Sequence, residues 1–210
     1  MEALLNPVEA RVLGALVEKQ ITTPDYYPLT LNGLTTACNQ KSNRFPVVAF
    51  DEKTVVRAQE SLRDKELARL VSGADMRVPK YYHLFVEKFE LTPPQVAALC
   101  VLMLRGPQTT GEIRGRSGRL YGFADLGEVE QTLKALSERD GGAMIMQLER
   151  QPGRKEARYA HLLCGEPEAA AALELRADNE RIAALEEEVI ALRDELAVLQ
   201  RAFEEFKGQF

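Results

Sequence analysis

The sequence predicts a mainly α-helical chain with small β-hairpins, an α+β class in which two similar units stand in tandem before one long C-terminal helix. Two observations lead to this expectation. The order helix, short helix, helix and hairpin occurs twice, and residues 168–207 carry an apolar heptad pattern without glycine or proline. We therefore expect a first domain over residues 1–88, a second over 89–166, and a coiled-coil helix over 167–210.

The first helix of each unit begins with the same residue types. Asn6 and Thr92 are N-cap residues followed by proline, with Glu or Gln three positions after the cap, which is a capping-box arrangement. Apolar residues then correspond at an offset of 86, as Leu13 does with Leu99, and each set forms one stripe at helical spacing. The pattern predicts two related amphipathic helices.

The second long helix of each unit is predicted to begin after Asp51 and after Asp125, because an aspartate at the N-cap accepts hydrogen bonds from the first free amides of a helix. Hairpin patterns with glycine-containing tips follow over residues 68–85 and 144–163. The two histidines of the chain fall at equivalent places in these hairpins. We interpret them as residues that close each small sheet, in preference to a catalytic or switching role.

A shorter helical piece lies between the long helices, over Leu31–Cys38 in the first unit and from Thr110 to about Arg116 in the second. Three helices followed by a two-stranded wing are typical of the winged-helix variant of the helix-turn-helix. We therefore interpret residues 5–86 and 91–164 as tandem winged-helix domains. Their short junction predicts that they pack against each other.

Several runs also resemble a known family, the YceH-type bacterial proteins. The runs that carry this resemblance are Glu18–Pro24, Tyr27–Leu29, Asn32–Gly33, Thr36–Arg44, Leu104–Thr109 and Gly111–Arg114. The match extends through most of residues 4–166. The resemblance implies a tandem winged-helix fold, in agreement with the repeat, and it implies no established activity.

The charge of the chain is unevenly distributed. Its 210 residues include 27 Lys and Arg against 32 Asp and Glu, and the net charge of −5 argues at first against a nucleic-acid partner. Residues 1–90 hold 12 basic and 12 acidic side chains, residues 91–166 hold 10 and 9, and residues 167–210 hold 5 and 11. The acidity therefore belongs to the C-terminal helix, and the two predicted domains are nearly neutral.

The C-terminal heptads predict a parallel homodimer through residues 175–206. Nine of ten core positions are apolar, with Ile and Val at a and leucine at d in its central heptads, which favours a two-stranded coiled coil. The dimerisation residues that we expect are Ile182, Leu185, Val189, Leu192, Leu196, Leu199, Phe203 and Phe206. The alternative is an amphipathic helix that folds back onto its own domains.

Basic residues concentrate on the predicted wings and on the segments that precede each third helix. The candidate nucleic-acid contacts are Lys41, Asn43, Arg44, Arg77, Lys80, Arg114, Arg116, Arg119, Arg154 and Lys155, and the wings also contain Arg150 and Arg158. Arginine forks match phosphate geometry, and neighbouring glycines let a backbone approach phosphate closely.

Two features oppose this interpretation. The third helix of the second unit opens with the acids Asp125, Glu128 and Glu130, which would repel phosphates. The three arginines of residues 114–119 could also simply pair with those acids. Two functions therefore remain: double-stranded DNA binding as a transcription or chromosome-associated factor, and protein–protein interaction without DNA contact.

The remaining classes are disfavoured. Enzyme motifs are lacking, the three cysteines form no CxxC pair, and we expect no metal and no cofactor. Tyr26 and Tyr27 are interpreted as packing residues. The longest apolar run, Val96–Leu104, is too short for a membrane span, so we expect a core helix there and a cytoplasmic protein without membrane contact.

Overall fold

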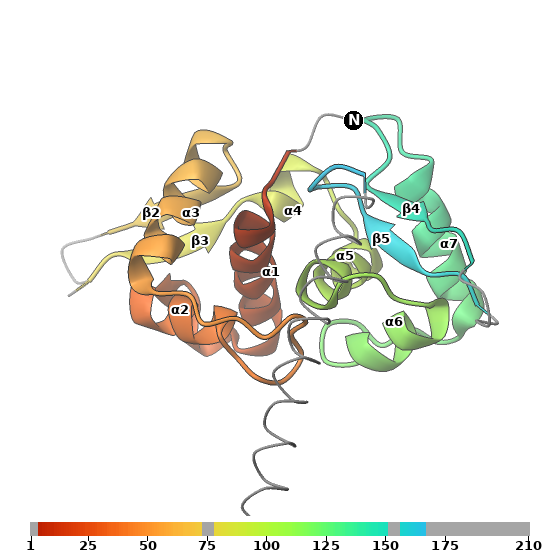
Figure 1. Ribbon diagram of the computed structural model, residues 1–210, viewed down its shortest axis with the longest axis horizontal. Helices are drawn as coiled ribbons and strands as arrows, with labels where there is room; N and C mark the ends of the chain where they lie inside the picture. Colours follow the sequence, from red (N-terminus) through yellow and green to blue (C-terminus); the bar gives the residue numbers. More distant parts are fainter. Residues whose placement is uncertain (1–3, 73–77, 151–155, 167–210) are drawn as a thin grey trace, which may run out of the picture. The chain divides into compact units, whose positions relative to one another are not determined.

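The predicted helices and hairpins occur in the predicted order (Figure 1), and the structure adds a short 3-10 helix over Pro24–Tyr26, the strand β1 and the short helix α4. The computed structural model describes residues 4–72, 78–150 and 156–166. One compact unit extends from Met1 to Pro167, and residues 168–210 form a second unit that lies outside the described residues. The predicted coiled coil and its eight dimerisation residues therefore lie outside the described part of the chain, and the dimer stays a prediction.

The described part is mainly helical, with about seven helices and two small sheets. Its first half contains α1 (Pro7–Thr22), β1 (Leu29–Thr30), α2 (Leu31–Cys38), α3 (Glu52–Asp64), β2 (Ala68–Val71), β3 (Lys80–His83) and the short α4 (Phe85–Lys88). Its second half contains α5 (Pro93–Arg105), α6 (Thr110–Ser117), α7 (Leu126–Ser137), β4 (Ile145–Gln147) and β5 (Tyr159–His161). Below, the first repeat means α1 to β3 and the second repeat means α5 to β5.

The predicted helix starts are confirmed by their hydrogen bonds. Asn6 Oδ1 accepts from the Glu9 amide at 2.9 Å while the Glu9 carboxylate accepts from the Asn6 amide at 2.8 Å, which completes the capping box of α1. The amide of Thr92 donates to the side chain of Gln95 at the start of α5. Asp51 and Asp125 accept from the third amide of α3 and α7, respectively.

The strands pair antiparallel in each repeat. The first sheet has the order β1-β3-β2 and the second contains β4 and β5. The sequence did not predict β1, which joins the first sheet because Leu29 pairs with Tyr81 of β3. The interpretation of both tyrosines as packing residues was half wrong: Tyr27 is partly buried and accepts from the His83 amide at 2.8 Å, whereas Tyr26 is 77% exposed.

The central contact of the fold joins α1 and α5, which lie side by side between the two sheets (Figure 1). Gly14 of α1 meets Cys100 of α5, and the thiol donates to the Gly14 carbonyl at 3.6 Å. A Cβ atom at Gly14 would lie 3.0 Å from Leu104 Cδ2, so the glycine sets how closely the helices approach. Residues 96–104 of α5 are all buried, as a core helix requires.

Candidate nucleic-acid interface

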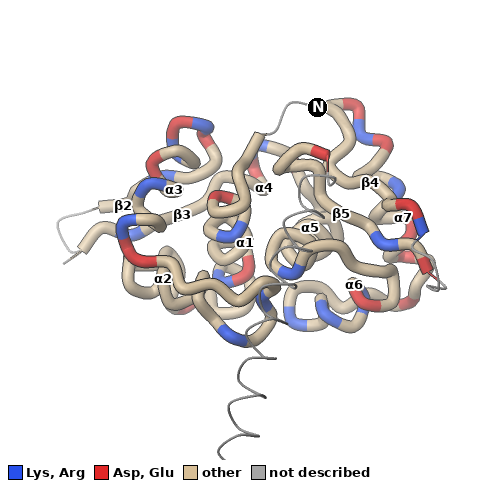
Figure 2. Tube along the Cα trace, viewed as in Figure 1, with Lys and Arg blue, Asp and Glu red and all other residues tan. Residues whose placement is uncertain are grey.

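A polar cleft of about 380 Å³ lies where the end of α1, the segment 39–50 and the second repeat meet. Leu104 and Val101 of α5 supply apolar contacts in it. The charged and amide groups come from both repeats: Glu18, Lys19, Gln40, Asn43, Arg105, Arg116 and Arg119. In Figure 2, basic residues gather where the segment after α2 approaches α6. The cleft therefore brings together candidates that are far apart in sequence.

Buried hydrogen bonds hold the segment 39–50 in place. Arg11 of α1 is 4% exposed and donates to the carbonyls of Cys38 and Pro46, at 3.3 and 2.7 Å. The amide of Phe45 donates to the Leu104 carbonyl at 2.9 Å, which attaches the segment to the second repeat. These bonds replace the backbone partners that a segment without regular structure lacks, so one face of the cleft is preorganised.

The prediction that Arg44 contacts nucleic acid is wrong, because this side chain is buried and paired. Its guanidinium has no exposed surface and forms a bidentate pair with the Glu18 carboxylate, at 3.0 and 2.6 Å. Its Nε also donates to the Ala37 carbonyl. A buried guanidinium whose donors are already engaged cannot contact a phosphate, so Arg44 is a structural residue that supports the cleft. In the sequence it looked like any other basic residue of a polar loop.

The three candidate arginines at positions 114, 116 and 119 are exposed, and they do not pair with the acids that open α7. Arg114 donates to the Ala124 carbonyl at 2.7 Å, and Arg116 lies 3.3 Å from Glu112 on its own helix and donates to Gln108. Within the described ranges, Arg119 forms no ion pair. Arg116 and Arg119 line the cleft, whereas Arg114 does not. The Asp125 and Glu128 side chains are instead engaged by α7 amides, by the Ala124 amide and by Tyr121.

Asn43 and Lys41 occupy the exposed side of the segment 39–50. Asn43 has a positive φ of 60°, a conformation that asparagine tolerates better than most residues, and its side chain accepts a hydrogen bond from Arg105. Lys41 is exposed between two residues that line the cleft, Gln40 and Ser42. Both residues therefore lie at or beside the cleft.

The wing candidates are distributed differently. Lys80 lies on β3, where it pairs with Val71 and Thr30, and it does not line the cleft. Arg77, Arg154 and Lys155 lie outside the described residues. Arg158 donates to the Pro107 carbonyl at 2.6 Å and lies 3.3 Å from Glu112, so its charge serves the packing of the second repeat.

Sequence reasoning missed two basic residues of the cleft, Lys19 and Arg105. Each lies in the last turn of a helix, where a cation also complements the negative end of the helix dipole. Burial lowers the pKa of Arg105, and the positive charges of Arg116 and Arg44 lower it further. The positive charges of these arginines therefore repel one another. An anion bound between them would relieve this repulsion.

The charge inside the cleft is positive. Its lining includes four basic side chains and one carboxylate, Glu18, which Arg44 already engages. The helix ends oppose an anion, because α1, α5 and α6 direct their C-terminal halves toward the cleft. Any attraction for phosphate must therefore come from the side chains.

The exposed faces of the third helices are less suited to nucleic acid. On α7 the exposed charged residues within the helix are Glu130 and Lys134, which cancel. On α3, Lys53, Arg57 and Arg63 alternate with exposed acids. Within the described residues, no three His, Cys, Asp or Glu side chains gather as metal ligands, and no helix is long and apolar enough to cross a membrane.

The fold and the cleft define a mainly helical protein with a positively charged cleft between its two repeats. The family described as "Protein of unknown function, DUF480" matches residues 5–154, and the chain belongs to it. The chain is similar to the UPF0502 proteins of Pelobacter propionicus and Geobacter metallireducens, with 52% and 56% identity over 220 residues and 100% coverage of both chains in each case. The family resemblance seen in the sequence is thereby confirmed, and the names of these relatives describe no activity.

Proposed function

We propose that the protein is a non-enzymatic tandem winged-helix protein that binds double-stranded DNA, with each repeat forming one winged helix and with domain boundaries at 88/89 and 166/167. The observation that supports DNA binding is the cleft, because it gathers Arg105, Arg116 and Arg119 of one repeat beside Lys19 and Asn43 of the other. The contacts are to phosphates, since the third helices offer no net positive face. Such binding is weak in sequence preference and strongly dependent on salt.

The test is the salt dependence of binding to a fluorescent 30-bp duplex, measured by anisotropy on the full chain. We expect binding at about 50 mM salt that weakens at least tenfold by about 200 mM. Replacing Arg116 and Arg119 together by Ala removes two phosphate contacts, so the negative slope of log K against log salt becomes shallower by about 2. No detectable binding at the lowest salt rejects DNA binding.

A matched control removes two exposed lysines outside the cleft. Lys53 of α3 and Lys134 of α7 change the net charge by the same amount when both are replaced by Ala. The proposal requires the slope of this control to stay close to that of the wild type. Equal losses in both double variants assign the binding to overall charge and contradict a role for the cleft.

The protein-interaction alternative is favoured by α7, because its exposed charges, Glu130 and Lys134, sum to zero. In this case the repeats bind a protein partner, and the full chain fails to bind the duplex at about 50 mM salt. Affinity purification of the full chain, followed by reconstitution from purified components, then identifies the partner. Lys134→Glu disrupts such a complex if α7 is its contact surface.

We further propose that residues 175–206 form the parallel homodimer. This proposal rests on the heptad pattern alone. Sedimentation of the full chain against a chain that ends at Pro167 tests it, and the same number of protomers per particle for both chains contradicts it.

A further inference from the structure

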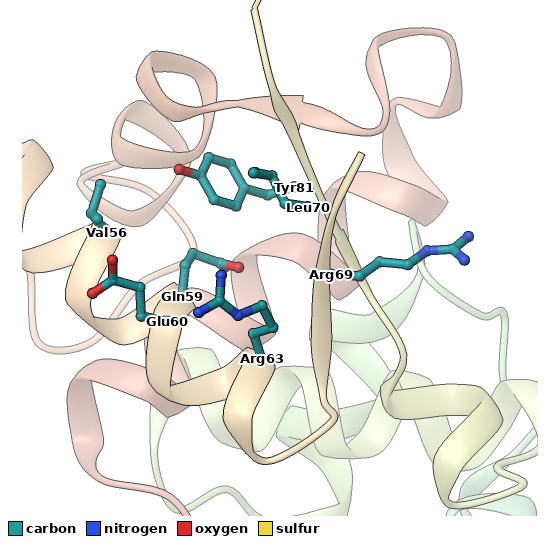
Figure 3. Close-up of a pocket in the computed structure, with 7 residues that line it drawn as sticks. All are labelled: Val56, Gln59, Glu60, Arg63, Arg69, Leu70 and Tyr81. Atoms are coloured by element: carbon teal, nitrogen blue, oxygen red, sulfur yellow. The ribbon is translucent and has the colours of Figure 1, made fainter. Parts of the chain in front are cut away.

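A second cavity lies within the first repeat, between α3 and the strands β2 and β3 (Figure 3). Its volume is about 90 Å³. One face of α3 lines it with Val56, Gln59, Glu60 and Arg63, which follow the spacing of a single helical face. The opposite wall includes Leu70 and Tyr81, which pair across the ladder between β2 and β3. Arg69 of β2 also lines the cavity, but its guanidinium points away from it in Figure 3 and lies over the Tyr82 ring at 4.6 Å.

Gln59 is the most unusual residue of this cavity. It is 4% exposed, and its side-chain Nε2 is buried without a hydrogen-bond partner among the described residues. In Figure 3 the carboxamide extends from α3 into the cavity, toward the strands. A buried amide donor without a partner is unfavourable, and a ligand that offers an acceptor removes this penalty.

Two opposite charges border the same cavity without pairing. Glu60 and Arg63 lie one turn apart on α3 and form no ion pair with each other, and Arg63 lies 3.7 Å from the exposed carboxylate of Asp64. Burial and the negative charge of Glu60 raise the pKa of Tyr81, which agrees with the position of this carboxylate beside the cavity. The cavity thus offers a carboxylate and a guanidinium at separate places on its rim.

The remaining contacts inside the cavity are apolar. Val56, the Tyr81 ring and Leu70, which is 46% exposed, form an apolar surface open to solvent. At about 30 Å³ for each water of the liquid, this volume of about 90 Å³ corresponds to about three waters. Only part of a small amino acid therefore lies inside the cavity, and the rest lies at its rim, where Leu70 is exposed.

We propose that this cavity binds a free aliphatic α-amino acid as its zwitterion. The ammonium group pairs with Glu60, the carboxylate pairs with Arg63 and accepts from the Gln59 amide, and the side chain packs on Val56, Leu70 and Tyr81. Each feature of the cavity has a counterpart in such a ligand. The site is separate from the cleft and does not depend on the proposed DNA binding.

The test is isothermal titration calorimetry of the full chain with L-alanine, L-valine and L-leucine. We expect at least one of them to bind with a Kd of about 1 mM or below. For L-valine, 3-methylbutanoate lacks the ammonium group and isobutylamine lacks the carboxylate. Each analogue of the preferred amino acid should bind at least about tenfold more weakly, because it leaves one charge of the site unpaired.

Variants distinguish this site from weak binding elsewhere. Glu60→Gln and Arg63→Gln should each weaken binding at least about tenfold. Arg57→Gln removes an exposed arginine of the same helix that does not line the cavity, and it should bind as the wild type does. Circular dichroism confirms that each variant is folded. Absence of heat from all three amino acids at about 10 mM, or unchanged binding in both rim variants, overturns the proposal.

Discussion

The two repeats share an element order but differ in how they satisfy their buried polar groups. Helix α1 buries the charged residues Glu9 and Arg11, whereas the buried stretch of α5 is apolar. Arg11 is buried because it donates to carbonyls at the end of α2 and in the segment 39–50. Glu9 is buried because it completes the capping box of α1 and pairs with Lys65. We call the contact between the two repeats the joint. The first repeat contributes its polar part, which includes Arg11, Glu18 and Arg44, and the second repeat contributes the apolar helix α5, against which α1 packs.

The largest expected effect comes from breaking the polar part of this joint. Glu18→Leu leaves Arg44 buried without a carboxylate, so we expect the free energy of unfolding to fall by about 3 kcal/mol or more. Urea denaturation measures this change. The control Lys19→Ala, which removes only a partner at 3.7 Å, should cost less than about 1 kcal/mol. The double variant Glu18→Leu with Arg44→Met should lose less free energy of unfolding than the two single variants lose together. If its loss equals their sum, the two side chains are not coupled.

The apolar part of the joint is probed at Gly14. Its equivalent in the second repeat at the offset of 86 is Cys100, the residue that it contacts. Gly14→Val should lower the free energy of unfolding by about 2–3 kcal/mol, because the added methyl groups overpack against Leu104 and Met103. Gly115→Val is the control, since a Cβ atom there meets nothing within 4 Å. Equal thermal shifts in both variants would show that close approach is not what Gly14 provides.

The two histidines, His83 on β3 and His161 on β5, occupy equivalent positions in the two repeats, and both should make stability depend on pH. His83 has no exposed surface, and burial lowers its pKa to about 4, with Glu87 opposing this shift. Burial also lowers the pKa of His161 to about 4. The unfolded chain binds these protons near the ordinary pKa of 6.5, so stability is full above that pH and declines as the pH falls toward 4.

For His83 alone, this linkage amounts to on the order of 2 kcal/mol between pH 7 and pH 5. Urea denaturation at several pH values should therefore show a smaller loss toward pH 5 in His83→Phe than in the wild type. His161→Phe should reduce the loss in the same direction. Wild-type acid sensitivity in both variants would contradict the linkage.

The smallest expected effect concerns the turns that follow the third helices. Glu66 and Gly142 occupy corresponding turns, both with positive φ, and each amide donates to the carbonyl three residues earlier. Glycine adopts this conformation without strain, so Glu66→Gly should raise the free energy of unfolding by about 0.5–1 kcal/mol. The exposed pair of Glu66 with Lys88 contributes little. A destabilised Glu66→Gly would assign a larger role to that pair.

Local features of the fold were predictable from the sequence, because caps and apolar stripes act over a few residues. Asn6 and Asp125 define their helix starts through bonds to residues three positions away. Arg44 and Arg105 were not predictable in the same way. The partner of Arg44 is 26 positions earlier, and Arg105 meets Asn43 only after two helices pack. The burial of Arg44 depends on tertiary contacts, and the sequence of the basic loop around it does not indicate which of its residues will be buried.

The attachment of the segment 39–50 to Leu104 has a consequence for synthesis of the chain. When a ribosome has released only the first repeat, neither the Leu104 carbonyl that Phe45 binds nor the Leu163 carbonyl that Leu5 binds exists yet. Domains generally fold as they emerge, but these two bonds must wait for later residues. The cleft therefore takes shape only after residues 101–120 have emerged, so a chain that ends after the first repeat presents Lys19 without the three arginines that line the cleft with it.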